Sequence, residues 1–188
     1  MKIISKNYQD EQKALHKNPN YGVASLSFAP MVAEIMKRNN FSSLSDYGAG
    51  RLRLLEGLKK QNLENFSYFP FDPAFPEYGE PKRAEMVCCI DVLEHVEPEY
   101  IAPTLKNLAK ITERVGFFSI HIGAAGKTLS DGRNAHLTQQ PTSWWLPKLC
   151  RHFDIVQLKQ HKLHGNGFWV IVVPLTTGQP ARQNGFKG

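Results

Sequence analysis

The chain has 188 residues, of which 41% are hydrophobic and 21% are charged. This composition is typical of a single globular domain with a real core. No apolar run approaches the roughly 20 residues of a membrane-spanning helix, and the first residues lack the apolar stretch of a signal peptide. We therefore expect a cytoplasmic protein with no membrane partner. The net charge of +6 permits an anionic partner without requiring one, since the basic residues are scattered.

The predicted elements divide the chain into an N-terminal arm or lid at 1–20, a main domain at 21–176 and a flexible tail at 177–188. Within the main domain, in chain order, we predict a helix at 24–39, a strand at 41–47, a helix carrying Leu52, Leu54, Leu55 and Leu58, a strand at 66–71, a loop at 76–81, a strand at 84–90, a helix that begins near Pro98, a strand at 115–122, a polar loop at 123–140, a helix at 144–153, and strands at 155–163 and 168–175 around a hairpin turn.

Strands that alternate with helices indicate a parallel sheet covered by helices on both faces. The terminal hairpin adds antiparallel strands to that sheet. The pattern thus predicts an α/β, Rossmann-like three-layer sandwich. The three cysteines, Cys88, Cys89 and Cys150, include no C-x-x-C pair, and we expect all three to be buried packing residues.

The first chemical signal is a glycine turn between a strand and a helix, Asp46-Tyr47-Gly48-Ala49-Gly50. Glycine allows the backbone to turn tightly and to approach a ligand closely. In open α/β sheets, ligands bind at such junctions. The turn alone indicates a nucleotide-type ligand.

Two acidic residues follow the next strands. Asp72, followed by Pro73, lies 22 residues after Gly50, and Asp91 begins the segment Asp91-Val92-Leu93-Glu94-His95-Val96. An acid at the end of the second strand can accept hydrogen bonds from both ribose hydroxyls of an adenosine. Glycine and acidic groups therefore meet at one edge of the predicted sheet.

These motifs resemble those of the class I S-adenosylmethionine-dependent methyltransferases, over roughly residues 20–175. The resemblance implies S-adenosyl-L-methionine as the cofactor. It also implies cofactor contacts at the first motif, at the ribose-binding acid and at the segment after the third predicted strand, namely Asp46, Tyr47, Gly48, Ala49, Gly50, Asp72, Pro73, Asp91, Val92, Leu93 and His95.

The chain departs from the family pattern at two points. Leu52 stands where a third glycine is common, and we expect it to be tolerated inside the helix. Only about a dozen residues separate Asp72 from Ala84, which is too few for the usual helix and strand. We therefore predict that the third strand of the usual seven is missing.

The polar loop at 123–140 supplies the candidate catalytic residues. His136 is suited to act as a general base, and Asn134 and Arg133 to orient an acceptor. Together with the segment around Tyr21, the loop is expected to form the acceptor pocket. Asn and Asp also serve turns, so a purely structural role stays open for this loop.

The leading hypothesis is methyl transfer to a hydroxyl or amine of a small molecule or sugar. One alternative is an RNA 2′-O-methyltransferase, for which a nucleic acid would be the partner. In that reading Asp91, Glu94, His95 and His136 would bind a divalent metal, as in small-RNA methyltransferases, although the Phe-Glu-Trp surroundings of that family's distant histidine are absent here. Another alternative is a non-catalytic module with the same fold. We assign no metal ligands from the sequence, and it does not indicate an oligomeric state.

Overall fold

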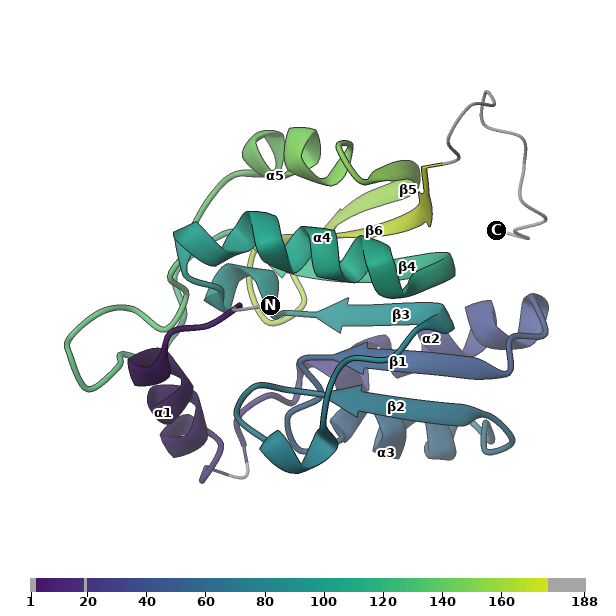
Figure 1. Ribbon diagram of the computed structural model, residues 1–188, viewed down its shortest axis with the longest axis horizontal. Coiled ribbons are helices and arrows are strands. Elements are labelled where there is room, and N and C mark those ends of the chain that lie inside the picture. The colour runs from purple at the N-terminus through teal and green to yellow at the C-terminus, as the bar shows by residue number, and fades with distance from the viewer. Residues whose placement is uncertain (1–2, 19, 176–188) are drawn as a thin grey trace.

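The computed structural model describes residues 3–18 and 20–175, so the predicted tail at 177–188 lies outside the described residues. Within them the strands form one sheet in the order β2-β1-β3-β4-β6-β5 (Figure 1). Their bounds are Ser43–Tyr47 for β1, Ser67–Phe71 for β2, Ala84–Ile90 for β3, Thr112–His121 for β4, Phe153–His161 for β5 and Gly167–Pro174 for β6. Strands β2, β1, β3 and β4 are parallel to one another, and β6 runs antiparallel to both β4 and β5.

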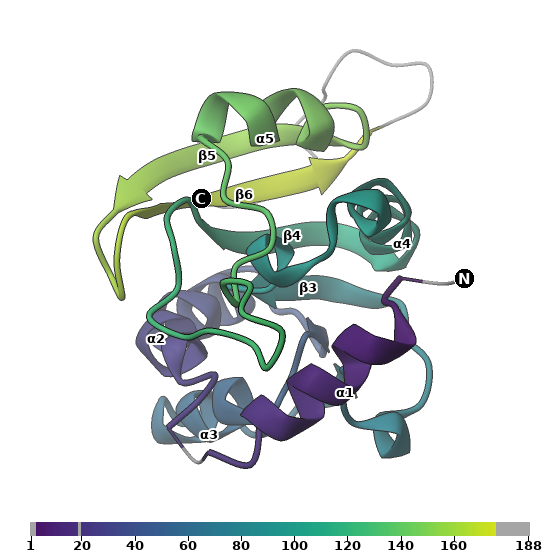
Figure 2. The same cartoon turned by 90° about the vertical axis from the view of Figure 1, so that its left-hand side faces the viewer.

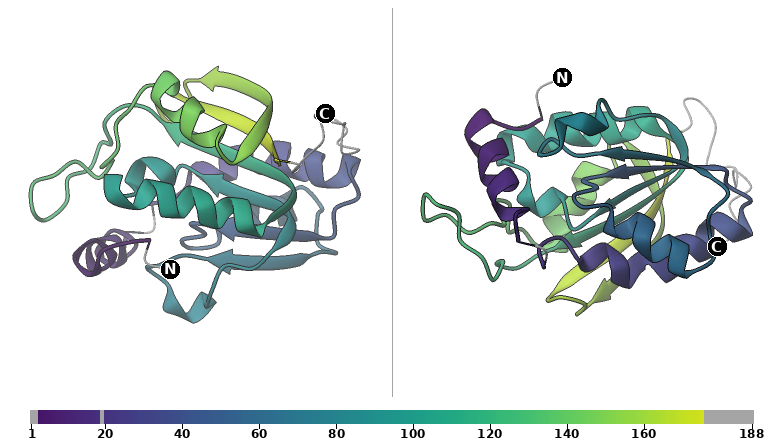
Figure 3. Two further views of the ribbon diagram at one scale, coloured as in Figure 1. Left: turned by 45° about the horizontal axis from the view of Figure 1, so that its top comes forward. Right: turned by 90° about the horizontal axis from the view of Figure 1, so that it is seen from below.

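Helices cover both faces of this sheet, as Figure 3 shows from two sides. The helices are α1 (Lys6–Leu15), α2 (Ala24–Arg38), α3 (Arg53–Lys60), α4 (Ile101–Ile111) and α5 (Thr142–Leu149), with 3-10 turns η1 (Pro76–Tyr78), η2 (Leu93–His95) and η3 (Pro98–Tyr100). Helices α2 and α3 share one apolar core with the sheet, and α4 and α5 share the core on the opposite face. The three-layer α/β prediction is confirmed.

The central strand β3 explains why the sequence reads as a continuous apolar run. Met86 and Cys88 point into the core on the α2 side, while Val87 and Cys89 point into the core on the α4 side. All four side chains are fully buried. A strand with helices on both faces has no polar side, so its sequence shows no alternation.

The predicted absence of one strand is confirmed within the described residues. The chain passes from β2 through η1 directly to β3, which pairs with β1 on the side away from β2. Strand β2 is therefore the edge of the sheet. No helix of the described chain is long and apolar enough to cross a membrane.

Three local predictions need correction. The helix predicted at 144–153 begins at Thr142 and ends at Leu149, because Phe153 already pairs with Pro174 in the hairpin. Cys150, at the end of that helix, is exposed, whereas Cys88 and Cys89 are buried as expected. Leu52 was expected inside the helix, but it lies before α3 in a left-handed conformation, with φ of 59°. Glycine adopts this conformation more easily than leucine does.

Gly48 is the residue on which the turn after β1 depends. Its φ is +86°, and a Cβ at this position would lie 2.3 Å from Cγ2 of Val92. Its amide donates to the carbonyl of Phe71 at 2.7 Å, which ties the turn to the end of β2. Neither the conformation nor the space allows a side chain.

Replacing Gly48 with alanine is therefore expected to destabilise the protein by about 2 to 4 kcal/mol, from backbone strain and the clash with Val92. For a chain of this size the melting temperature should fall by roughly 5 to 15 °C in a thermal unfolding experiment. Gly126→Ala is the matched control, since a Cβ there meets nothing within 4 Å. Equal stability of the two variants would contradict this account.

Candidate functional site

A cavity of about 370 Å³ lies at the carboxyl ends of the parallel strands. Figure 2 looks onto this edge, with α1 crossing in front of it and the 123–140 loop beside α1. The lining comes from the turn after β1, the ends of β2, β3 and β4, the loop and the N-terminal segment. It includes Asp46, Tyr47, Gly48, Ala49, Gly50, Asp72, Pro73, Asp91, Val92, His95, His121 and His136, and from the N-terminal segment Tyr8, Gln12, His16 and Tyr21.

The glycine turn and Asp72 form one hydrogen-bonded unit. The amide of Gly50 donates to Oδ2 of Asp72 at 2.9 Å, and the amide of Ala74 donates to Oδ1 at 2.8 Å. Burial raises the pKa of Asp72, and the two amide donors oppose that rise. The carboxylate is thus held by backbone groups at the edge of the cavity.

Asp46, the acid of the turn, is buried, with 4% of its surface exposed. The hydroxyl of Tyr68 on β2 donates to its Oδ2. Burial is the main cause that raises the pKa of Asp46 to about 7, and the Tyr68 hydrogen bond acts in the opposite direction. The neighbouring Tyr47 directs its ring into the α4 core against Phe71, with ring centroids 4.8 Å apart.

The segment after β3 turns sharply at Asp91, which has a left-handed φ of 50°. Its amide donates to the carbonyl of Ser119, and its Oδ1 accepts the Ser119 hydroxyl. Asp91 and Val92 line the cavity. Leu93 is not among the lining residues, and its side chain is fully buried in the core against α4.

Three histidine rings gather in the wall of the cavity. His136 lies between the other two, with its ring centroid 4.7 Å from that of His95 and 4.7 Å from that of His121. Burial and the neighbouring His136 lower the pKa of His95 to about 3, and burial also lowers the pKa of His136. Both imidazoles are therefore neutral at physiological pH and present a lone pair.

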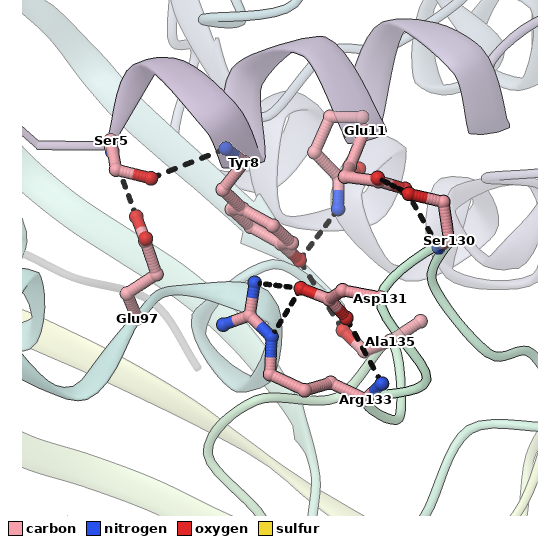
Figure 4. Close-up of polar contacts among 9 residues, drawn as sticks. Ser5, Tyr8, Glu11, Glu97, Ser130, Asp131, Arg133 and Ala135 are labelled. Atoms are coloured by element: carbon pink, nitrogen blue, oxygen red, sulfur yellow. Dashed lines mark hydrogen bonds and ion pairs between the residues drawn. The ribbon is translucent and has the colours of Figure 1, made fainter.

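The N-terminal helix α1 is held across the cavity by polar contacts at its N-terminus and near its middle (Figure 4). The Ser5 amide donates to Glu97 at 2.8 Å, and Oγ of Ser5 caps the helix by accepting from the Tyr8 amide. The Tyr8 hydroxyl donates to the carbonyl of Ala135 at 3.3 Å. Near the middle of the helix, the Ser130 amide and hydroxyl donate to Glu11. Helix and loop together cover the cavity.

Two of the predicted acceptor contacts do not reach the cavity. Arg133 is exposed on the loop, and its guanidinium pairs with Asp131 at 2.6 Å (Figure 4). Asn134 holds the loop in shape instead: its Nδ2 donates to the Ala125 carbonyl, and its Oδ1 accepts from the amides of Ala125 and His136. Of the three residues predicted as catalytic, the structure brings only His136 to the cavity wall.

The sequence predicted an arm or lid at 1–20, but it assigned no residue of α1 to the site. Tyr8 is 2% exposed, and Gln12 links its hydroxyl to that of Tyr21. His16 lies over the glycine turn, with its Cε1 2.8 Å from where a Cβ of Gly50 would stand. Burial and the nearby Arg51 lower the pKa of His16 to about 4. The only available signal was apolar or aromatic residues in a polar segment.

No protein-family model matches the chain, and no curated protein matches it in sequence. Solved structures do resemble it. A 1,6-didemethyltoxoflavin N1-methyltransferase from Burkholderia thailandensis, crystallised with its acceptor and S-adenosylhomocysteine, is 16% identical with a TM-score of 0.62, covering 90% of this chain and 88% of that one.

Two further structures with bound S-adenosylhomocysteine share the fold. The N-methyltransferase NodS of Bradyrhizobium japonicum has a TM-score of 0.55 at 9% identity, covering 90% of this chain and 99% of that one. Magnesium protoporphyrin IX methyltransferase of Synechocystis has a TM-score of 0.54 at 13% identity, covering 81% and 84%. The chain therefore has the fold of the class I S-adenosylmethionine-dependent methyltransferases, as its motifs indicated.

The buried Asp46 predicts a pH-dependent stability. Its pKa is about 7 in the folded protein and 3.8 for an ordinary aspartate, so the folded state holds a proton that the unfolded chain releases. The stability that this proton supplies is complete below pH 3.8 and is lost as the pH rises through about 7.

Asp46→Asn keeps an acceptor for the Tyr68 hydroxyl and removes this titration. Between pH 5 and pH 8, the free energy of unfolding in urea should fall by about 2 to 3 kcal/mol more in the wild type than in the variant. Asp154→Asn, at the far edge of the sheet, should follow the wild type. Parallel pH profiles for wild type and Asp46→Asn would show that Asp46 does not titrate in this range.

Proposed function

We propose that the protein is an S-adenosylmethionine-dependent methyltransferase that acts on a hydroxyl or amine of a small molecule. The observation that carries this proposal is the continuity of the cavity. The glycine turn, Asp72 and Asp91 line it together with His95 and His136. A methyl donor and an acceptor need to meet in one space, and this cavity holds groups suited to each.

The residues of the turn fit the proposed cofactor. Gly48 and Gly50 bring bare backbone to the cavity wall, where a Cβ would intrude. Asp72 is 9% exposed and presents a carboxylate that can accept hydrogen bonds from two ribose hydroxyls. Asp46 offers a second acid at the same wall, suited to a cationic group such as an α-ammonium.

When bound, S-adenosylmethionine supplies an electrophilic methyl group on a sulfonium, which transfers directly to a nucleophile. The chain then needs to hold the acceptor in line and to remove its proton. His136 is suited to the second task because its Nδ1 is bonded to the Gly123 carbonyl at 2.7 Å, which leaves Nε2 free to accept a proton.

The cover formed by α1 and the 123–140 loop favours a small acceptor over RNA. Contacts from Ser5 to Glu97 and from Ser130 to Glu11 hold the helix across the cavity. A polymer would need these contacts to open, whereas a small molecule can be enclosed. Methylation of RNA, which the net charge of +6 would favour, is therefore the second candidate function.

Calorimetric titration with S-adenosylmethionine and S-adenosylhomocysteine tests the proposal. Binding of either ligand in a 1:1 ratio is the expected result. If neither binds, the methyltransferase proposal fails and the reading as a non-catalytic module is favoured. Release of S-adenosylhomocysteine on addition of small hydroxyl or amine compounds would then identify the acceptor class.

Asp72→Ala should weaken S-adenosylmethionine binding at least about 100-fold, because two charge-assisted hydrogen bonds are lost. Asp72→Asn keeps an acceptor for the Gly50 amide and should cost about 10-fold. Glu77→Gln removes an exposed charge nearby and should leave the affinity unchanged. Wild-type affinity in Asp72→Ala would contradict the ribose assignment.

A further inference from the structure

We propose that Glu94, His95 and His136 form a binding site for one divalent transition-metal ion at the wall of the cavity. One potential ligand atom from each of the three residues lies within 4.8 Å of the other two. An ion with ligands at about 2.1 Å separates them by roughly 3 to 4 Å, so modest side-chain rotation closes the set around it.

The two histidines are already oriented as metal ligands are. Nδ1 of His95 lies 2.9 Å from the carbonyl of Ala135, and Nδ1 of His136 lies 2.7 Å from the carbonyl of Gly123. A carbonyl only accepts, so Nδ1 carries the hydrogen in both rings. Each Nε2 therefore bears a lone pair. A backbone carbonyl on one ring nitrogen, with the other nitrogen free, is the arrangement that fixes metal-binding imidazoles in proteins.

Glu94 provides the independent observation that points to a ligand. Its side chain is fully buried, and its Oε1 accepts the His121 amide at 3.1 Å. Its Oε2 is also buried and has no hydrogen-bond partner among residues 3–18 and 20–175. A buried carboxylate oxygen without a partner is costly, and a dication beside it removes that cost.

The backbone brings these residues together from distant parts of the chain. Glu94 and His95 belong to η2, at the end of β3, while His136 lies 41 residues further on, in the polar loop. The Thr138 amide donates to the Glu94 carbonyl at 2.9 Å, which fastens the loop to η2. Asp91, which the sequence grouped with these residues, accepts the Ser119 hydroxyl through its Oδ1 and lies outside the three-residue set.

Two imidazole nitrogens and one carboxylate oxygen suit Mn²⁺, Fe²⁺, Co²⁺ or Zn²⁺ better than Mg²⁺ or Ca²⁺, which prefer oxygen ligands. Three protein ligands leave positions open, and His95 and His136 line the cavity. With the ion bound, Nε2 of His136 is a ligand, and the ion rather than this histidine activates the acceptor. An acceptor oxygen can occupy an open position, where the ion would lower the pKa of its hydroxyl. That role rests on the proposed methyl transfer, whereas the ion site does not. An ion at this site would favour acceptors with two adjacent oxygen atoms, because both oxygens can bind the ion.

Titration of untagged, chelator-treated protein with Co²⁺ tests the site without cofactor or acceptor. One equivalent should bind and produce visible absorption bands of nitrogen and oxygen coordination. Calorimetry with Mn²⁺ and Zn²⁺ gives the affinities. Absence of stoichiometric binding for all three ions would overturn the proposal. Because S-adenosylmethionine binding is measured separately on metal-free protein, failure of the ion site and failure of the methyltransferase proposal are distinguishable.

Three variants locate the ion. His95→Asn and His136→Asn keep a donor for the backbone carbonyl but lose Nε2, and Glu94→Gln keeps an acceptor for the His121 amide. Each should weaken Co²⁺ binding at least 10-fold and alter the absorption bands, with circular dichroism confirming the fold. His164→Asn is the matched control, since His164 lines the same cavity outside the set. Unchanged binding in the three variants, or an equal loss in the control, would refute the assignment.

Discussion

The geometry of the site depends on the hydrogen bond from the Gly50 amide to the Asp72 carboxylate. It links the turn after β1 to the end of β2, beside the bonds from the Gly48 and Ala49 amides to the Phe71 carbonyl. The Tyr78 hydroxyl on η1 closes the same unit by donating to the Gly50 carbonyl. Strand β2 is the edge of the sheet and has no strand on its outer side. These bonds therefore hold its end in place beside the turn after β1.

The cavity gathers ionisable groups whose burial opposes their charge. Burial raises the pKa values of Asp46, Asp72 and Glu94 and lowers those of His95 and His136. A folding chain gains nothing from such groups by themselves, because each is taken from water with incomplete compensation. Their concentration at one edge of the sheet is what a binding site requires, and ligands that pair with them would restore the lost stability.

The cover over the cavity is built from segments more than one hundred residues apart. Tyr8 contacts the carbonyl of Ala135, and that carbonyl also accepts from His95. The position of α1 is thereby coupled to the loop that carries His136. Movement of the helix would therefore disturb the loop and one of the histidines together.

The sequence by itself determined the alternation of strands and helices, the missing strand after β2, and the placement of Gly48, Asp72 and Asp91 at one edge. These follow from local rules, since apolar runs select the buried strands and parallel strands end at the same edge. It could not place the loops. Leu52 adopts a left-handed conformation, Arg133 pairs with Asp131, and Asn134 shapes the loop. Only the tertiary structure showed which residues of α1 contact the loop, and only it placed His136 beside Glu94 and His95 while leaving Asp91 outside that set. The physical reason is that a loop's conformation is fixed by hydrogen bonds to distant segments, and sequence periodicity carries no record of those partners.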